Sequence, residues 1–318
     1  MQLISEAEAK RLISMRQAIE AVEAAFLAME TGAAEIFPIA LGHGSEPANR
    51  FAVKSGLFRD RGLLGMKIGA YWPANSARHL ESHSSTTLLL DDATGRPRAL
   101  VSASYLTAIR TAAADGVACR HLSRLDSETL AVVGAGHQAW FEILAVCAVR
   151  AIKTVLIWGR DAGKAEALAL RVRNELDLQA QSLPIEAAVS QADILVTVTP
   201  AAEPLIRQAW LKRGVHISAM GADAPGKQEL DIDVVTAGRL FADVAAQSQT
   251  IGEFQAAARA GLVPASAITA LGAVIRTPRL GRRNRWEATV FDSSGIALQD
   301  LAMADLVLTA ANAKHSAN

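Results

Sequence analysis

Four basic side chains interrupt stretches of the sequence that are otherwise apolar or rich in small residues. Lys67 stands in GLLGMKIGAYW, Arg50 and Lys54 stand in NRFAVKSG, and Arg110 stands in YLTAIRTAAA. Cations in such settings can bind a carboxylate, and arginine does so through a planar fork of N–H donors. If the strands and the helix that carry them face one cleft, the sequence predicts an anion site suited to an α-carboxylate. For each residue taken singly, the alternative is a solvated position.

An acidic side chain follows another apolar segment. Asp223 lies in HISAMGADAPGK, just after a run that is typical of a buried strand. Ligands of parallel α/β sheets bind beyond the carboxyl ends of the strands, so a carboxylate here could exchange a proton with a substrate. Its neighbours Ala222, Ala224 and Pro225 are small or apolar, and we expect them to desolvate the carboxylate in part. The alternative is a turn-forming aspartate ahead of Pro225 and Gly226.

A glycine-rich turn lies near the middle of the chain, in TLAVVGAGHQAW. An apolar run stops at Gly134, Gly136 follows, and Ala139 stands three residues later, at the start of a helix-like stretch. The first glycine permits a tight turn, the second lets a pyrophosphate approach the backbone, and the small third residue lets helix and strand pack closely. The helix N-terminus adds N–H donors and the positive end of a dipole. The pattern predicts a dinucleotide site, with an ordinary strand-to-helix corner as the alternative.

The end of the next strand bears on the choice of cofactor. That strand, TVLIWG, is followed by Arg160 and Asp161. An NAD site has an acidic residue here for the ribose 2′-hydroxyl, whereas a guanidinium fits a 2′-phosphate. Arg160 therefore favours NADP, and NAD is the alternative if Asp161 turns toward the ribose. Asp161 is otherwise the expected N-cap of the next helix, and Arg160 a solvated surface charge.

The first third of the chain mixes helices and strands. A capping box of Ser5 and Glu8 predicts a helix that runs to Gly32. Strand-like segments broken by Gly, Pro and Asp then extend to about Leu100, and a helix is expected over residues 104–123. After Gly295 comes a long helix that is apolar on two faces. We expect it to pack back on the N-terminal part, with a partner subunit covering the rest.

From residue 129 short apolar strands alternate with helical segments, which predicts a parallel, doubly wound sheet. The fold class is therefore α/β, with a Rossmann-type sheet beside a smaller α+β domain. We place the Rossmann domain at residues 121–294. Residues 1–120 and 295–318 form the second domain.

The composition is that of a globular protein with a large core: 51% of the 318 residues are hydrophobic, 20% are charged and the formal net charge is +0. This balance gives no sign of a surface for nucleic acid or membrane. The first residues lack the basic and apolar regions of a signal peptide, and no apolar run reaches the ~20 residues of a spanning helix. We expect a cytoplasmic protein with two buried free thiols, Cys119 and Cys147. No sequence motif predicts a metal site.

Four segments, in this order, resemble the ornithine cyclodeaminase/mu-crystallin family: LTAIRTAA, VVGAGHQA, GADAPGKQELD and VFDSSGIALQD. With MKIGAYWPAN added, the resemblance runs over nearly the whole chain. It implies a homodimer in which one domain binds NAD(P). The other domain, built from the N-terminal part and the C-terminal helix, would bind substrate and dimerise. The family contains ornithine and lysine cyclodeaminases, alanine dehydrogenases and reductases of cyclic ketimines.

The resemblance also implies roles for individual residues. Arg50, Lys67 and Arg110 would hold the substrate carboxylate, and Asp223 would be the catalytic acid or base, with Lys67 as the next candidate. Beside Arg160, the cofactor would be bound by Thr86, Thr111, Gly134, Gly136, His137, Gln138, Thr197, Thr199, Lys227 and Ser293. The sequence WGRD departs from the acidic residue expected of a cyclodeaminase, and it is closer to the mu-crystallin type with its NADPH preference.

These features predict an NAD(P)-dependent oxidoreductase of small imino or amino acids. It would reduce a cyclic ketimine of the pyrroline- or piperideine-2-carboxylate type, or interconvert an amino acid and its imino or oxo acid. Two alternatives stay open: an ornithine cyclodeaminase that forms proline and ammonia with catalytic NAD, and a non-catalytic NADP-dependent binding protein. An acid at Asp223 favours an enzyme, because a pure binder has no need of one in the cleft.

Overall fold

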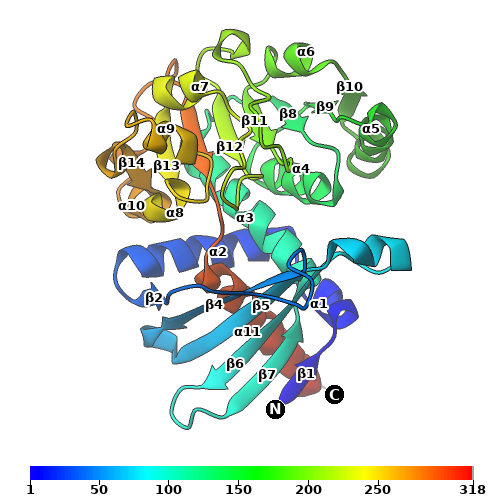
Figure 1. Ribbon diagram of the computed structural model, residues 1–318, viewed down its shortest axis with the longest axis vertical. Coiled ribbons are helices and arrows are strands. Elements are labelled where there is room, and N and C mark those ends of the chain that lie inside the picture. Colours follow the sequence, from blue (N-terminus) through cyan, green and yellow to red (C-terminus); the bar gives the residue numbers. More distant parts are fainter. Residues whose placement is uncertain (317–318) are drawn as a thin grey trace. The chain divides into compact units, whose positions relative to one another are not determined.

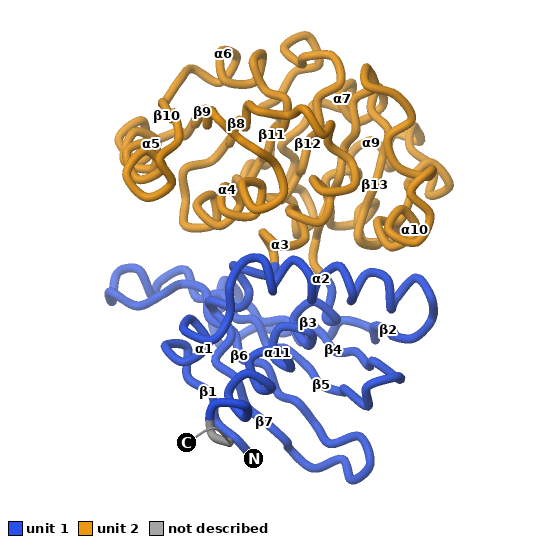
Figure 2. Tube along the Cα trace, turned by 180° about the vertical axis from the view of Figure 1, so that it is seen from behind, with its two compact units in different colours: residues 1–110, 296–318 blue, residues 111–295 orange. Residues whose placement is uncertain are grey.

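The computed structural model describes residues 1–316 and separates into two compact units (Figure 2). Unit 1 comprises residues 1–110 and the chain from residue 296 onward, and unit 2 comprises residues 111–295. The division falls inside helix α3 (Ser104–Leu122) and not at residue 120, the boundary expected from the sequence. The first turns of α3 contact unit 1, for example through the hydrogen bond between the hydroxyls of Ser85 and Thr107. The last turns contact unit 2, where Arg150 donates to the backbone carbonyl of Cys119. No helix within residues 1–316 is long and apolar enough to cross a bilayer.

Unit 1 is built on a mixed seven-stranded sheet (Figure 1). Strands β4 to β7 form an antiparallel meander, β1 pairs with β7 in parallel, and β2 and β3 both pair with β4. The strands are β1 (Gln2–Ile4), β2 (Ala34–Ile36), β3 (Ala40–His43), β4 (Arg50–Phe58), β5 (Leu63–Tyr71), β6 (His83–Asp91) and β7 (Pro97–Ser102). This sheet carries the predicted cations Arg50 and Lys67.

The predicted first helix is two helices, α1 (Glu6–Leu12) and α2 (Met15–Glu30). Ser5 caps α1 by accepting from the backbone N–H of Glu8, as the sequence suggested. The chain then leaves the helical conformation, because Ser14 and Gln17 form a complete capping box that starts α2. The prediction of one uninterrupted helix was therefore wrong: it overlooked a second start signal.

The C-terminal helix α11 (Ala297–Ser316) packs back on unit 1, as predicted (Figure 1). It contacts the sheet strands β4 and β5 on one side and α2 on the other. Side chains on both of its apolar faces, including Leu298, Leu301 and Met303, are buried by the chain's own residues. On the second apolar face Met303 is buried, but Leu306 and Ala310 are only half-buried, so the expectation that a partner subunit covers the rest of this helix stays a prediction.

Unit 2 contains an eight-stranded parallel sheet in the order β10-β9-β8-β11-β12-β15-β13-β14. All six strands expected in this region form, and the short edge strands β10 and β14 are additional. The strands are β8 (Thr129–Val133), β9 (Thr154–Trp158), β10 (Gln179–Ser182), β11 (Ile194–Thr197), β12 (His216–Ala219), β13 (Arg239–Ala242), β14 (Ile268–Ala270) and β15 (Thr289–Asp292). The order reverses between β8 and β11, which is where doubly wound sheets bind their ligands.

Helices of unit 2 connect these parallel strands, and one core cluster of buried apolar side chains lies against the sheet. They are α4 (His137–Val149), α5 (Ala162–Leu176), α6 (Ile185–Val189), α7 (Ile232–Ala237), α8 (Ala245–Ser248), α9 (Gln255–Arg259) and α10 (Leu271–Arg276). Short 3-10 turns occur at Arg59–Arg61, Pro73–Arg78, Gln208–Trp210, Ala265–Ala267 and Pro278–Leu280.

Candidate active site

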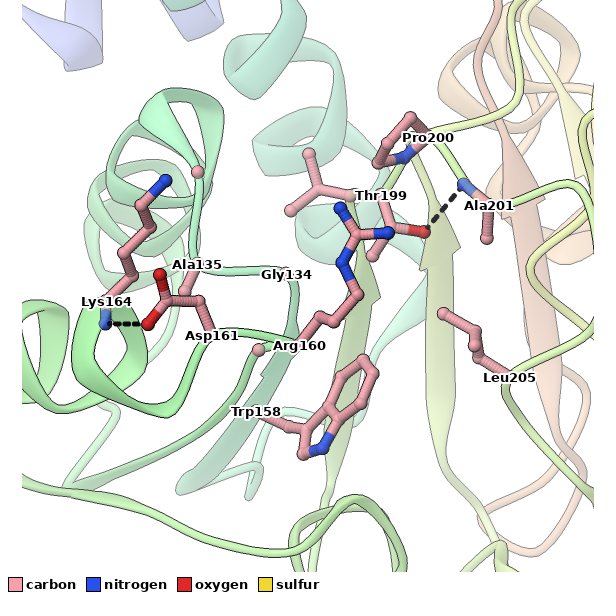
Figure 3. A pocket seen from close by; sticks show the side chains of 13 residues that line it. Gly134, Ala135, Trp158, Arg160, Asp161, Lys164, Thr199, Pro200, Ala201 and Leu205 are labelled. Atoms are coloured by element: carbon pink, nitrogen blue, oxygen red, sulfur yellow. Dashed lines mark hydrogen bonds between the residues drawn. The ribbon is translucent and has the colours of Figure 1, made fainter.

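A cleft of about 310 Å³ lies in unit 2 at the carboxyl ends of β8, β9 and β11 (Figure 3). It coincides with the point where the strand order reverses, the usual place for a dinucleotide. Its walls combine the glycine turn, the end of β9 and the loop after β11. The lining residues are Gly134, Ala135, Gly136, Trp158, Gly159, Arg160, Asp161, Lys164, Val198, Thr199, Pro200, Ala201 and Leu205.

The glycine turn has the geometry that its spacing predicts. Gly134 has a φ of 124°, and a Cβ at this residue would lie 2.7 Å from the carbonyl oxygen of Val198. Gly136 is the N-cap of α4, and no atom lies within 4 Å of the place where its Cβ would be. The N-terminus of α4 therefore offers unobstructed backbone N–H donors, which suits a pyrophosphate.

Two cations from the end of β9 and the start of α5 line this cleft. Arg160 extends into it, and Lys164 stands one turn further along the chain (Figure 3). Asp161 is the N-cap of α5, and its Oδ1 accepts from the backbone N–H of Lys164 at 3.1 Å. Of the two roles considered for Asp161, the structure shows the capping role. Lys164 was missed, although its place four residues after Arg160 was a usable signal.

A buried carboxylate, that of Glu229, fixes the far wall of the cleft. Its Oε1 accepts from the backbone N–H and hydroxyl of Thr199 at 2.6 and 2.7 Å, and its Oε2 accepts from the hydroxyl of Thr197 and the N–H of Gly221 at 2.8 and 2.9 Å. Burial raises the pKa of Glu229, and these hydrogen bonds oppose that rise. Glu229 thus positions the loop that carries Thr199; the sequence analysis did not single it out.

Of the other residues of unit 2 that were predicted to bind the cofactor, only Thr199 is among those that line the cleft. Thr197 is completely buried against Glu229, and only Thr199 of this pair lines the cleft. His137 is exposed on the first turn of α4, where Gln138 donates to Glu142 at 2.7 Å. Ser293 is buried and donates to Asp243. Two further predicted residues are Thr111, which is half-buried on α3, and Lys227, which lies in the loop after β12.

Asp223 lies in that same loop after β12 (His216–Ala219), as predicted, but its surroundings differ from the expectation. Its side chain is 60% exposed, and its Oδ1 lies 2.5 Å from the ammonium of Lys227. The expectation that small neighbours desolvate this carboxylate was wrong, because the loop projects beyond the strand and a cation meets the acid there. The Asp223–Lys227 pair unites the predicted acid with a predicted cofactor residue.

Unit 1 brings two of the predicted cations together in a buried cluster. Lys67 Nζ lies 2.8 Å and Arg110 Nε 3.0 Å from the same oxygen, Oδ1 of Asp300 on α11. Arg110 also donates to the side-chain oxygen of Gln299 at 3.1 Å. Burial is the largest cause that lowers the pKa of Lys67 to about 7; Arg110 and Lys54 add to the lowering, and Asp300 opposes it. Neither Asp300 nor Gln299 was predicted, although an acid within the apolar segment IALQDLA was a visible signal.

The register of the sheet places the remaining predicted residues of unit 1. Lys54 is directly opposite Lys67, so both side chains lie on the same face, and Arg50, four residues earlier in the strand, shares that face at an exposed position. On β6 the residue opposite Lys67 is Thr87, whereas Thr86 pairs with Ile68. Thr86 therefore lies on the other face of the sheet from the cation cluster. The structure groups three cations on one face and separates Thr86 from them.

The fold gathers one group of possible metal ligands within residues 1–316. Atoms of Asp115, Cys119 and His216 lie within 4.8 Å of one another, and all three side chains are completely buried. Cys119 donates to Asp115, and the two ring nitrogens of His216 pair with Thr289 and Ser218. Burial lowers the pKa of His216 well below its usual value and raises that of Cys119. These bonds describe a buried polar network, and we assign it no metal.

Comparison with known proteins adds to this geometry. The model of the ornithine cyclodeaminase/mu-crystallin family matches residues 1–315. The chain belongs to this family. The predicted family and the predicted α/β fold class are thereby confirmed.

Named relatives are similar to this chain over almost its whole length. The iminosuccinate reductase of Paracoccus denitrificans is 38% identical over 99% of this chain and 98% of its own. Its crystal structure in complex with NAD⁺ matches with a TM-score of 0.95, covering 99% of this chain and 97% of that one. The structure of the Thermococcus litoralis Δ¹-pyrroline-2-carboxylate reductase, solved with NADH and L-proline, is 29% identical and matches with a TM-score of 0.94. The match covers 99% of this chain and 98% of that one. The Archaeoglobus fulgidus alanine dehydrogenase is 33% identical over 98% of this chain and 96% of its own.

These relatives are reductases and dehydrogenases, and the solved structures among them contain NAD⁺ or NADH. The predicted class, an NAD(P)-dependent oxidoreductase, is confirmed. The cofactor is a nicotinamide dinucleotide.

Proposed function

We propose that this protein reduces a small imino acid to the corresponding amino acid with NADPH. The observation that carries the proposal is the buried Lys67–Arg110 pair, whose two positive charges share one counter-charge, Asp300. When Lys67 is protonated, the three groups together carry one net positive charge, which matches a single α-carboxylate. We take the reacting group to be an imine because relatives of this chain are named as reductases of iminosuccinate and of pyrroline-2-carboxylate, which are both imines.

In the proposed reaction Lys67 and Arg110 hold the substrate carboxylate and so orient C2 of the substrate, which is a positioning effect. The dinucleotide supplies the hydride that C2 receives. Asp223 gives a proton to the imine nitrogen, so that the C=N bond becomes a CH–NH bond and the carboxylate of Asp223 is reprotonated from solvent. The exposure of Asp223 suits that last exchange with water. Lys67, with a pKa near 7, is the alternative proton donor.

A preference for NADP over NAD rests on Arg160 and Lys164. Both line the cleft where the ribose next to the adenine should lie, and a guanidinium with an ammonium suits a 2′-phosphate. The one acidic side chain there, Asp161, uses an oxygen to cap α5. Its second oxygen could still accept from a 2′-hydroxyl, so the relative affinity for the two cofactors is the quantity to measure.

The experiment that tests the function is a panel of substrates with each cofactor. Pyrroline-2-carboxylate, piperideine-2-carboxylate, pyruvate with ammonia, and oxaloacetate with ammonia are each mixed with NADPH or NADH, and the loss of absorbance of the reduced cofactor is followed. We expect at least one imine to be reduced, faster with NADPH. Ammonia released from ornithine with catalytic NAD and no net oxidation would indicate a cyclodeaminase instead. Cofactor binding with no turnover on any substrate would indicate a binding protein.

We further propose that the protein is a homodimer and that the sheet of unit 1 is its interface. The sheet face opposite Lys67 carries Phe51 and Ile68, two residues that are 37% and 45% exposed. Large exposed apolar side chains on one sheet face are typical of a contact surface. Analytical ultracentrifugation of the wild type should give a mass of twice the 33.6 kDa of one chain. The Ile68→Asp variant should sediment as a monomer. Leu262→Asp, at an exposed apolar position of unit 2, is the matched control; a wild-type monomer would contradict the proposal.

A further inference from the structure

One carboxylate oxygen organises the cation cluster of unit 1. Oδ1 of Asp300 accepts from Lys67 and from Arg110, and the three side chains are 3%, 6% and 9% exposed for Asp300, Lys67 and Arg110 respectively. Asp300 Oδ2 and Gln299 Nε2 are buried without a hydrogen-bond partner within residues 1–316. The cluster therefore has further buried hydrogen-bonding capacity beside the two cations.

More positive than negative groups surround Lys67. From α3 it faces the guanidinium of Arg110, and from β4 it faces the ammonium of Lys54, which is its direct partner in the sheet register. The neighbouring residue on β6 is the uncharged Thr87. Only Asp300, from α11, contributes a negative charge among the groups of unit 1 that act on Lys67. Without that carboxylate, a buried ammonium would stand beside two other cations, an arrangement that favours loss of its proton.

We propose that Asp300 is a positioning residue for the reaction, which holds Lys67 protonated and aligned with Arg110 so that the pair can bind the substrate carboxylate. The inference rests on the proposed function, in which this pair is the carboxylate site. Asp300 touches no reacting atom in this account. It acts through the lysine, by charge and by a hydrogen bond at 2.8 Å.

The geometry also explains why one acid must serve both cations. A second carboxylate would lower the net positive charge of the cluster and with it the attraction for an anionic substrate. No carboxylate at all would leave two like charges in a buried site, where one of them would be given up. A single shared oxygen satisfies both cations and leaves one positive charge for the ligand.

The test is the pH dependence of kcat/KM for the imino acid in Asp300→Asn. In the wild type this quantity should fall as the pH rises through about 7, because Lys67 loses its proton there. Asp300 raises the pKa of Lys67, so its removal lowers that pKa and moves the alkaline limb to lower pH by about 1–3 units. At neutral pH kcat/KM should fall about fivefold or more, mainly through KM, while the Kd for NADPH stays unchanged. In the Lys67→Met variant, the fall of kcat/KM on the alkaline side of the pH profile should disappear.

Asp305→Asn is the matched control, since Asp305 lies on the same helix and pairs at 4.0 Å with a more exposed cation, Arg98. Its profile should follow that of the wild type. A profile of Asp300→Asn that drops equally at every pH, or a limb that persists in Lys67→Met, would overturn the proposal. If Asp300→Asn does not fold, Asp300→Ser leaves room for a water and should give the same shift. A wild type that reduces no imine would instead refute the proposed function, so the two failures are distinguishable.

Discussion

Replacing Asp223 by asparagine should lower kcat for imine reduction by about 10²–10⁴-fold, the usual cost of removing a general acid. Asparagine keeps the size of the side chain but cannot relay a proton. The Asp223–Lys227 pair is exposed, so its loss should cost only about 0–1 kcal/mol of folding free energy. The Kd for NADPH, measured by fluorescence, should stay close to that of the wild type.

Asp233→Asn supplies the control for this variant, because Asp233 is an exposed acid on α7 of the same unit. It should turn over as the wild type does. Near-normal turnover of Asp223→Asn together with weakened NADPH binding would identify Asp223 as a partner of Lys227 in the cofactor loop. The proton would then have to come from another group, and Lys67 would be the first to examine.

Replacing Arg160 by alanine should weaken NADPH binding by roughly 1.5–3 kcal/mol, the value of one hydrogen bond to a charged group. This corresponds to about a 10–150-fold rise in Kd. NADH lacks the 2′-phosphate, so its Kd should hardly change. The measurement is a titration of both reduced cofactors followed by fluorescence. Lys164→Ala should act in the same direction if both cations meet the phosphate.

Lys153→Ala is the control for Arg160, since Lys153 precedes the same strand β9 at its opposite end and is exposed. It should leave both affinities unchanged. Equal losses for NADPH and NADH in Arg160→Ala would show that the guanidinium serves the pyrophosphate or the stability of the cleft. The preference for NADP would then lose its support.

Much of the fold could be predicted because its signals are local. The alternation of strand and helix after residue 129 predicted the parallel sheet, and Gly134 and Gly136 marked its cofactor turn. The long helix after Gly295 was predicted from its own periodicity, and so was its return to the N-terminal part. Edge strands such as β10, with the sequence QAQS, lack an apolar pattern and were missed.

The candidate site was predictable only in part, because its key contacts join residues far apart in sequence. Lys67 and Arg110 stood out as isolated cations, but Asp300, which binds them, is 233 and 190 positions away. Glu229 acts on Thr199 across 30 positions, and no sequence spacing announces that contact. Thr86 shows a different limit: a shift of one residue along a strand places a side chain on the opposite face.

The most direct test of the central claim is to follow the hydride itself. The protein is incubated with an imino acid from the panel and with NADPH deuterated at both C4 positions, and the amino acid formed is examined by mass spectrometry. The account predicts one deuterium at C2 of the amino acid for each NADPH oxidised. Product without deuterium, or cofactor oxidation without any amino acid, would contradict it.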